Sequence, residues 1–326
     1  MKAIIYTQYG PPDVLRLVEV KQPAIKENDV LVKVIAAAVN YSNSAFIRGM
    51  PFMVRMMGAG LIKPKYKILG SEIAGRVEAV GKNVTQFHPG DEVYGDLSDC
   101  GRGGYAEYVS VTETALALKP KNLNFEEAAA VPETAVVALQ GLRDKGQIKP
   151  AQKVLIAGAS GGIGTFAVQI AKSYDSEVTG VCSTRNLELV RSIGADHVID
   201  YTREDFTRNG ERYDLILATA GYRSMFDYAR VLNPKGSYVV TGGSMTQVFQ
   251  PMFLGPWLSL TQDKKFSNLL MKINQANLVF MKELIEAGKV KPVIDRCYTL
   301  SETADAMRYY QQGHARGKVI IRIEGG

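Results

Sequence analysis

The strongest constraint on the fold is a strand, a glycine-rich turn and a helix in direct succession. The apolar run Lys153-Val-Leu-Ile-Ala157 predicts a strand, and the amphipathic pattern from Gly164 to Tyr174 predicts a helix. Between them stands Gly158-Ala-Ser-Gly-Gly-Ile-Gly164. Glycines let a pyrophosphate approach the backbone closely, and the N–H groups that begin a helix attract its negative charge. We therefore expect a dinucleotide at this turn, in contact with Ser160, Gly161, Gly162 and Ile163.

Strands and helices continue to alternate after this turn. The predicted strands are 153–157, 177–182, 197–199, 213–217 and 237–240, and the predicted helices are 164–174, 185–193 and 223–232. Alternation of this kind is typical of a doubly wound parallel sheet with helices on both faces.

The first 120 residues have a different pattern. Short β-branched runs at 30–35, 73–80 and 105–109 are separated by glycine and proline, which predicts a small, loop-rich antiparallel sheet. Residues 48–67 lack periodicity and predict a long loop or short helix. A helix is expected from Asn124, kinked at Pro132.

The chain is expected to form two domains, since domains usually contain about 100–200 residues. The last residues are predicted as strand 297–300, helix 301–312 and strand 318–322, which return to the first domain. The fold class is α/β. We place a β-rich domain at 1–122, completed by 293–326, and a doubly wound dinucleotide-binding domain at 123–292.

Composition excludes several classes of protein. Three cysteines, at 100, 182 and 297, cannot form a disulfide framework or an all-cysteine zinc site. The net charge of +6 comes from scattered basic residues, so nucleic acid is not expected as a partner. The apolar runs are shorter than the roughly 20 residues that span a bilayer, and no secretory signal is recognisable. We expect a cytoplasmic protein with no membrane partner.

The residues after the glycine turn indicate which dinucleotide binds. A short-chain dehydrogenase would need a Tyr-x-x-x-Lys pair, and none of the 16 tyrosines has a lysine four residues later. An NAD site usually has an acidic residue about 20 positions after the last glycine. Here Ser183-Thr184-Arg185 stands at that place, and a hydroxyl with a guanidinium suits a 2′-phosphate. The predicted cofactor is therefore NADPH, although Arg185 also fits a surface position that opens the next helix. Tyr201 is a candidate for packing on the adenine, with core or surface packing as the alternative.

The order of these parts resembles the medium-chain dehydrogenase/reductase superfamily over essentially the whole chain. The motifs that carry the resemblance are Leu69 to Gly75, His88 to Val93, Gly103 to Glu107, Val154 to Gly164, Ser192 to Val198 and Gly317-Lys-Val319. The residues in these motifs are most similar to those of the zinc-free quinone-oxidoreductase branch of the superfamily. The resemblance implies a GroES-like domain followed by a Rossmann domain. It also implies cofactor contacts by Thr134, by Ala220 and Gly221, by Gly243 and by Lys318.

In the zinc alcohol dehydrogenases of this superfamily, a cysteine and a histidine hold the catalytic metal. Asn40 stands in the place of the cysteine here, and Ser71 in the place of the histidine. The structural zinc would need four cysteines where this chain has only Cys100. Since tetrahedral zinc requires thiolate or imidazole ligands at those places, we expect no metal.

Without a Lewis acid, the chemistry that remains is hydride transfer to an electrophile already activated by conjugation. We expect an NADPH-dependent reductase of quinones or α,β-unsaturated carbonyls (enals and enones), with Asn40 and Tyr41 as the candidate catalytic residues. The Tyr41 phenol either donates a hydrogen bond to the substrate oxygen or forms an aromatic wall of the pocket. The alternative is an NADPH-binding protein with little turnover, acting as a binding or structural partner.

The apolar stretch 249–260 contains the only tryptophan, Trp257. It suits a substrate pocket, a dimer contact or a membrane surface, in that order of preference. A homodimer is the expected assembly.

Overall fold

The computed structural model describes residues 1–220, 223–242, 255, 259, 263–272 and 274–323. It divides into two compact units. Unit 1 comprises Met1–Glu133, Ile273–Glu286 and Pro292–Gly326, and unit 2 comprises Thr134–Lys272 and Ala287–Lys291. No helix among the described residues is long and apolar enough to cross a bilayer. The expected apolar stretch 249–260 lies outside the described residues, apart from Gly255 and Ser259.

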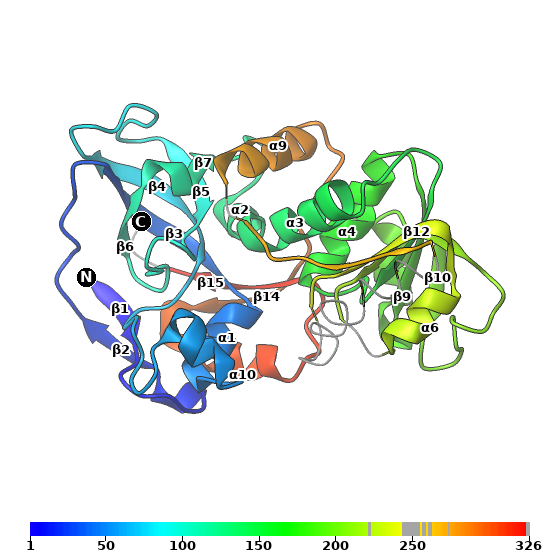
Figure 1. The fold of residues 1–326 in the computed structure, drawn as a ribbon. Helices are drawn as coiled ribbons and strands as arrows, with labels where there is room; N and C mark the ends of the chain where they lie inside the picture. Colours follow the sequence, from blue (N-terminus) through cyan, green and yellow to red (C-terminus); the bar gives the residue numbers. More distant parts are fainter. Residues whose placement is uncertain (221–222, 243–254, 256–258, 260–262, 273, 324–326) are drawn as a thin grey trace. The chain divides into compact units, whose positions relative to one another are not determined.

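Unit 2 contains a parallel sheet of six strands in the order β10-β9-β8-β11-β12-β13. Three of its strands, β9, β10 and β12, are labelled in Figure 1. The strands are β8 (Lys153–Ala157), β9 (Glu177–Cys182), β10 (His197–Asp200), β11 (Tyr213–Ala218), β12 (Leu232–Val240) and β13 (Lys265–Asn268). The helices are α3 (Pro132–Leu139, which begins in unit 1), α4 (Gly162–Ser173), α5 (Leu187–Ser192) and α6 (Met225–Arg230). A π-helical turn (Gln140–Lys145) and a 3-10 turn (Thr184–Asn186) complete it. The sequence order and the sheet order together confirm the doubly wound class.

Unit 1 is built on a seven-stranded mixed sheet. Its order is β14-β15-β3-β4-β5-β7, with β6 also paired to β3, and a separate ribbon joins β1 to β2. The strands are β1 (Lys2–Ile5), β2 (Arg16–Glu19), β3 (Asp29–Val39), β4 (Glu72–Val80), β5 (Glu92–Asp96), β6 (Tyr108–Thr112), β7 (Leu116–Leu118), β14 (Ile294–Thr299) and β15 (Lys318–Arg322). The helices are α1 (Tyr41–Arg48), α2 (Phe125–Ala129), α9 (Gln275–Glu286) and α10 (Thr303–Gln311). Short helical turns lie at Pro12–Val14, Arg55–Ala59, Glu113–Ala115 and Leu300–Glu302.

The C-terminal strand returns to the first sheet, as the sequence predicts. β15 pairs antiparallel with β3, with Val319 opposite Val39. Apolar side chains from both strands are fully buried in the core of unit 1. This pairing brings Lys318 to the same end of the sheet as α1, and it thereby positions the site described below.

Helix α9 differs from the sequence assignment, which placed it in the dinucleotide-binding domain. The Tyr94 hydroxyl donates to the Leu278 carbonyl oxygen (2.6 Å), and the Gln275 amide donates to the Leu116 carbonyl oxygen (2.7 Å). These bonds attach the helix to unit 1. The domain boundary between residues 122 and 123 stays a prediction.

Several element boundaries differ from the sequence reading, and two of these differences have a clear physical reason. The strand predicted at 105–109 is β6, at Tyr108–Thr112, because Tyr105 lies in a segment that bonds to Leu69 and Ile4 outside the main ladder. β12 begins at Leu232 and not at 237. The strand continues through the apparent turn at residues 233–236, with Lys235 at φ +62°, because Leu232 already pairs with Tyr213.

Candidate functional site

The glycine turn of unit 2 is closed tightly at the end of β8. Gly158 has φ +83°, a conformation that favours glycine. A Cβ atom at Gly164 would lie 2.1 Å from the carbonyl oxygen of Gly158, so this backbone contact also requires glycine. Gly161 caps α4 without a side-chain bond. The first N–H groups of α4, at Gly162 and Ile163, have no acceptor within the helix and suit a pyrophosphate.

The turn lies where the strand order of the parallel sheet changes direction. β8 pairs with β9 on one side and with β11 on the other. Thr219, at the end of β11, donates its hydroxyl to the carbonyl oxygens of Ala157 (2.9 Å) and Gly158 (3.2 Å). Ligands of doubly wound sheets bind at this kind of position. Ala220 follows there, whereas Gly221 and Gly243 lie outside the described residues.

One buried amide joins the glycine turn to the loop after β9. Asn186 donates from Nδ2 to Ser160 Oγ (3.0 Å) and to Ser183 Oγ (3.2 Å). The structure thus brings together two serines that the sequence analysis selected separately. Arg185 lies exposed beside them in the turn Thr184–Asn186. Asn186 is not among the residues predicted from the sequence, although its place next to Arg185 is a signal that it belongs to this loop.

The loop that carries Arg185 is also held from the neighbouring strand. Asp200, at the end of β10, accepts hydrogen bonds from the hydroxyls of Thr184 (2.5 Å) and Thr202 (2.7 Å). Its carboxylate is thereby occupied by the two threonines. Tyr201 follows and is 41% exposed, and its proposed contact with the adenine stays a prediction. Thr134 lies buried in α3.

Unit 1 contains a second set of selected residues, in a polar cluster formed by the half-buried Glu133 and five buried residues, Asn40, Asn43, Ser71, Glu72 and Lys318. Asn40 caps α1, and its Oδ1 accepts from the Asn43 N–H (2.9 Å). Its Nδ2 contacts Ser71 Oγ (2.7 Å) and Glu133 Oε2 (2.5 Å). The Ser71 hydroxyl donates to the same Glu133 oxygen (3.1 Å). Both residues that replace zinc ligands are therefore committed to hydrogen bonds with side chains.

The cluster contains a buried ion pair. Lys318 Nζ lies 2.5 Å from Glu72 Oε2, and the side chains are 2% and 0% exposed. The other oxygen of Glu72 accepts from the Glu133 N–H (3.0 Å). The sequence analysis assigned Lys318 to the cofactor, and that contact stays a prediction. The ion pair shows that Lys318 also holds the polar cluster together.

These residues do not fit a zinc ion. The Asn40 amide directs its donor nitrogen, and not its carbonyl oxygen, at Ser71 and Glu133. Glu72 is already neutralised by an ammonium group. Zinc requires thiolate, imidazole or free carboxylate ligands. Among the described residues, no three His, Cys, Asp or Glu side chains gather as a metal site.

The cluster and its surroundings contain more carboxyl groups than cations, so one carboxyl group is expected to be protonated. Three carboxyl groups, of Glu72, Glu133 and Asp96, face two cations, Lys318 and Arg102. Burial, and then the negative charge of Glu72, raise the pKa of Glu133 well above the usual carboxyl range. Burial raises the pKa of Asp96 as well. One of these carboxyls therefore holds a proton at neutral pH, because a surplus buried charge is costly.

We expect this proton to make stability depend on pH. The folded state retains a proton on Glu133 that the unfolded chain releases, so the contribution of Glu133 to the free energy of unfolding is highest below the ordinary carboxyl pKa. It falls as pH rises through the raised pKa, by up to about 1.4 kcal/mol per pH unit. Glu133→Gln should flatten this slope in urea unfolding curves recorded at several pH values. Glu78→Gln, at an exposed position, is the control. An unchanged slope in the Glu133 variant would contradict the assignment.

The second candidate catalytic residue, Tyr41, differs from Asn40 in exposure. It is the first residue of α1 and is 55% exposed, whereas Asn40 is 3% exposed. Asn40 is thus positioned to organise the polar cluster, and Tyr41 presents its phenol at the surface of unit 1. The sequence analysis missed Glu133. Glu133 could have been recognised as a candidate because it is the single carboxylate in the apolar stretch from Val131 to Leu139.

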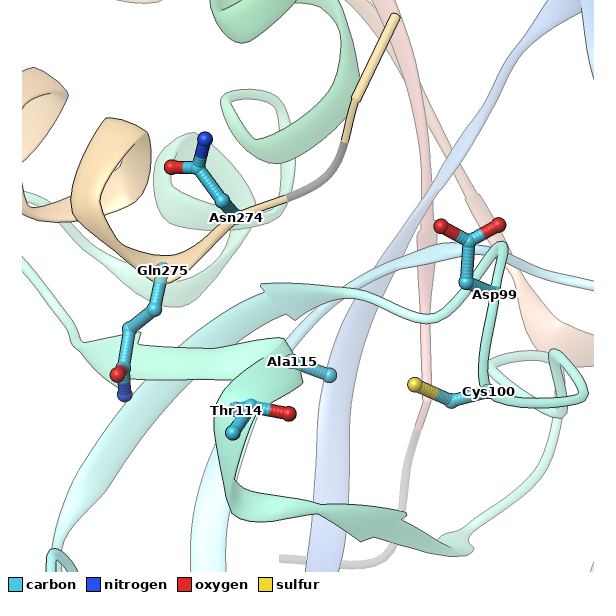
Figure 2. Close-up of a pocket in the computed structure, with 6 residues that line it drawn as sticks. All are labelled: Asp99, Cys100, Thr114, Ala115, Asn274 and Gln275. Carbon is cyan, nitrogen blue, oxygen red and sulfur yellow. The ribbon is translucent and has the colours of Figure 1, made fainter.

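The three thiols are not activated. Burial raises the pKa of Cys100, of Cys182 (to about 11) and of Cys297. Cys100 contributes to a small open pocket of unit 1, which Asp99 also lines (Figure 2). A nearby carboxylate disfavours the thiolate, so this pocket lacks the positive surroundings of a reactive cysteine.

Comparison with known proteins identifies both domains. Residues 26–121 match the family described as "Alcohol dehydrogenase GroES-like domain", and residues 193–321 match "Zinc-binding dehydrogenase". The 2-methylene-furan-3-one reductase of Solanum lycopersicum is 36% identical over 98% of this chain and 79% of its own length. The chloroplastic NADPH-dependent alkenal/one oxidoreductase of Arabidopsis thaliana is 35% identical over the same shares. The quinone oxidoreductase from Coxiella burnetii has a similar structure, with a TM-score of 0.88 and 28% identity over 99% of both chains.

The predicted cytoplasmic location is wrong. The alkenal/one oxidoreductase is named chloroplastic, and further plant relatives are named for the chloroplast or its envelope. Nothing in the two sites distinguishes one compartment from another, so the expected residues contain no information about location.

Proposed function

This chain belongs to the medium-chain dehydrogenase/reductase superfamily, in its zinc-free quinone-oxidoreductase branch, and we propose that it reduces quinones or α,β-unsaturated carbonyls with NADPH. The observation that carries the proposal is the bonding of Asn40 and Ser71. These residues stand in the places of zinc ligands and are held by Glu133. A site without a Lewis acid requires a substrate that conjugation has already activated.

We assign cofactor binding to the two loops of unit 2. Ser160, Gly161, Gly162 and Ile163 hold the pyrophosphate, and Ser183 and Arg185 hold the 2′-phosphate. Thr134, Tyr201, Ala220, Gly221, Gly243 and Lys318 complete the proposed set. Bound NADPH supplies the hydride. The Tyr41 phenol donates a hydrogen bond to the substrate oxygen as negative charge develops there, and Asn40 fixes the first turn of α1 that carries Tyr41.

The proposal is tested by mixing the chelator-treated protein with NADPH and a panel of quinones and enals. We expect oxidation of NADPH that depends on the acceptor. Loss of activity on chelation would contradict the metal-free mechanism. Tight NADPH binding with no oxidation across the panel would favour the alternative, a binding protein with little turnover. The names of the relatives give that alternative no support.

The preference for NADPH over NADH rests on the loop after β9. We expect Arg185→Leu to lower kcat/KM for NADPH by about 10- to 100-fold, because a charge-assisted bond to phosphate contributes roughly 1.5–3 kcal/mol. The value for NADH should change little, since NADH lacks the 2′-phosphate. Arg191→Leu, in α5, is the matched control. Equal losses with the two cofactors would mean that Arg185 does not contact the 2′-phosphate.

The homodimer also remains a proposal, which sedimentation equilibrium tests directly. A monomer at micromolar concentration would contradict it.

A further inference from the structure

Exposed apolar side chains are concentrated in one segment of unit 1. Among the described residues, fourteen large hydrophobic side chains are exposed, and six of them lie within residues 50–62. The six are Met50, Phe52, Met53, Met56, Leu61 and Ile62, and Ile62 is 87% exposed. A contiguous apolar group of this kind on a protein surface marks an interaction site.

The same segment is cationic and contains no carboxylate. Residues 30–71 contain no Asp or Glu, and five of their six basic residues are Arg48, Arg55, Lys63, Lys65 and Lys67. Arg48 and the three lysines are exposed. None of these four takes part in any of the ion pairs found among the described residues. Their charge is therefore available to an anionic partner.

Two backbone carbonyl groups hold the segment to the rest of unit 1. The Gly60 carbonyl oxygen accepts from the Tyr9 hydroxyl (2.5 Å), and the Lys67 carbonyl oxygen accepts from the Tyr6 N–H (3.0 Å). The Arg55 guanidinium also lies 4.4 Å from the centre of the Tyr9 ring. The exposed side chains thus belong to an anchored element, which binds a partner at a lower cost in conformational entropy than a free chain would.

We propose that residues 48–67, the cationic apolar segment, attach the protein to an anionic lipid surface. Leu61 and Ile62 enter the boundary between headgroups and acyl chains, while Lys63, Lys65 and Lys67 contact lipid phosphates. The apolar side chains suit the acyl-chain layer of such a surface, and the lysines directly after them suit its layer of phosphate headgroups. The proposal reverses the sequence expectation that no membrane is a partner, and it does not depend on the proposed reduction.

Two other occupants fit the segment less well. A second copy in a two-fold contact would bring the same lysines together across the interface, where like charges repel. A single-stranded nucleic acid would need aromatic side chains for base stacking, and Phe52 is the only exposed aromatic residue among the six.

The test is co-sedimentation of the full-length protein with phosphatidylcholine vesicles, with and without phosphatidylglycerol. We expect binding only to the anionic vesicles, weakened by salt. Lys63→Glu/Lys65→Glu/Lys67→Glu should weaken it about 100-fold, and Leu61→Ser/Ile62→Ser about tenfold or more. Thermal unfolding and NADPH binding confirm that the variants fold.

Matched controls separate local from general effects. Lys21→Glu/Lys26→Glu/Lys149→Glu changes the net charge equally at exposed lysines outside the segment, and Leu270→Ser removes an apolar side chain that is 74% exposed. Both should retain binding. The proposal is overturned if wild-type protein stays in the supernatant with anionic vesicles, or if the charge control weakens binding equally. Loss of a dimer in the Leu61/Ile62 variant, with vesicle binding unchanged, would assign the segment to a subunit contact.

Discussion

Replacing Lys318 by methionine is expected to lower the free energy of unfolding by about 3–5 kcal/mol. The substitution nearly preserves volume but leaves the fully buried Glu72 carboxylate without its cation. A buried charge deprived of its partner is far more costly than the absence of the whole pair. Chemical unfolding at neutral pH measures the loss.

The matched variant removes both charges. Lys318→Met/Glu72→Gln should recover a large part of the lost stability, because no unpaired charge remains in the cluster. Lys82→Met, which breaks the exposed pair with Glu27, should cost less than about 1 kcal/mol. A loss below about 1 kcal/mol in Lys318→Met would show that the ion pair does not stabilise the fold.

The second large effect is expected at the glycine turn. A Cβ atom at Gly164 would lie 2.1 Å from the Gly158 carbonyl oxygen and 2.8 Å from Ala159 Cα, both of them backbone contacts. Gly164→Ala therefore forces the start of α4 away from β8. A displacement of about 1 Å at a binding site can cost about 100-fold, so we expect the Kd for NADPH to rise by about that factor or more.

Gly161→Ala provides the comparison. Its Cβ would meet only the Gly158 carbonyl oxygen, at 3.6 Å, an ordinary contact. The fold should therefore tolerate this change, and any loss of NADPH binding would come from the blocked approach of the pyrophosphate. Thermal unfolding of the cofactor-free proteins, with fluorescence titration of NADPH, distinguishes the two effects. Wild-type affinity in Gly164→Ala would contradict the assigned turn geometry.

Local pattern was sufficient to predict much of the parallel sheet. The strands predicted at 153–157 and 177–182 of this sheet have the same bounds in the structure, as does the strand predicted at 318–322 in the mixed sheet of unit 1. Each is a short apolar run that ends at glycine, polar residues or a charge. The error at β12 has a tertiary cause, since pairing of Leu232 with Tyr213 overrides the turn propensity of Asn-Pro-Lys-Gly.

The polar cluster could be predicted only in part. Asn40 and Ser71 were recognisable because the superfamily has metal ligands at their places. The contact between Lys318 and Glu72 joins residues 246 positions apart, and no local pattern in one sequence encodes such a pairing. The role of Glu133 follows from its burial beside two other carboxyl groups, which only the folded chain brings together.

The raised pKa values of the three thiols affect how readily electrophiles could inactivate the protein. Quinones and enals are electrophiles that alkylate thiolates, so a reductase that binds them works among reagents able to inactivate it. Metal-binding cysteines would be permanent targets, because zinc keeps them deprotonated. This chain uses amide, hydroxyl and carboxyl groups at those places, and burial keeps its three thiols protonated. Its thiols are thereby less reactive toward the compounds we propose it reduces.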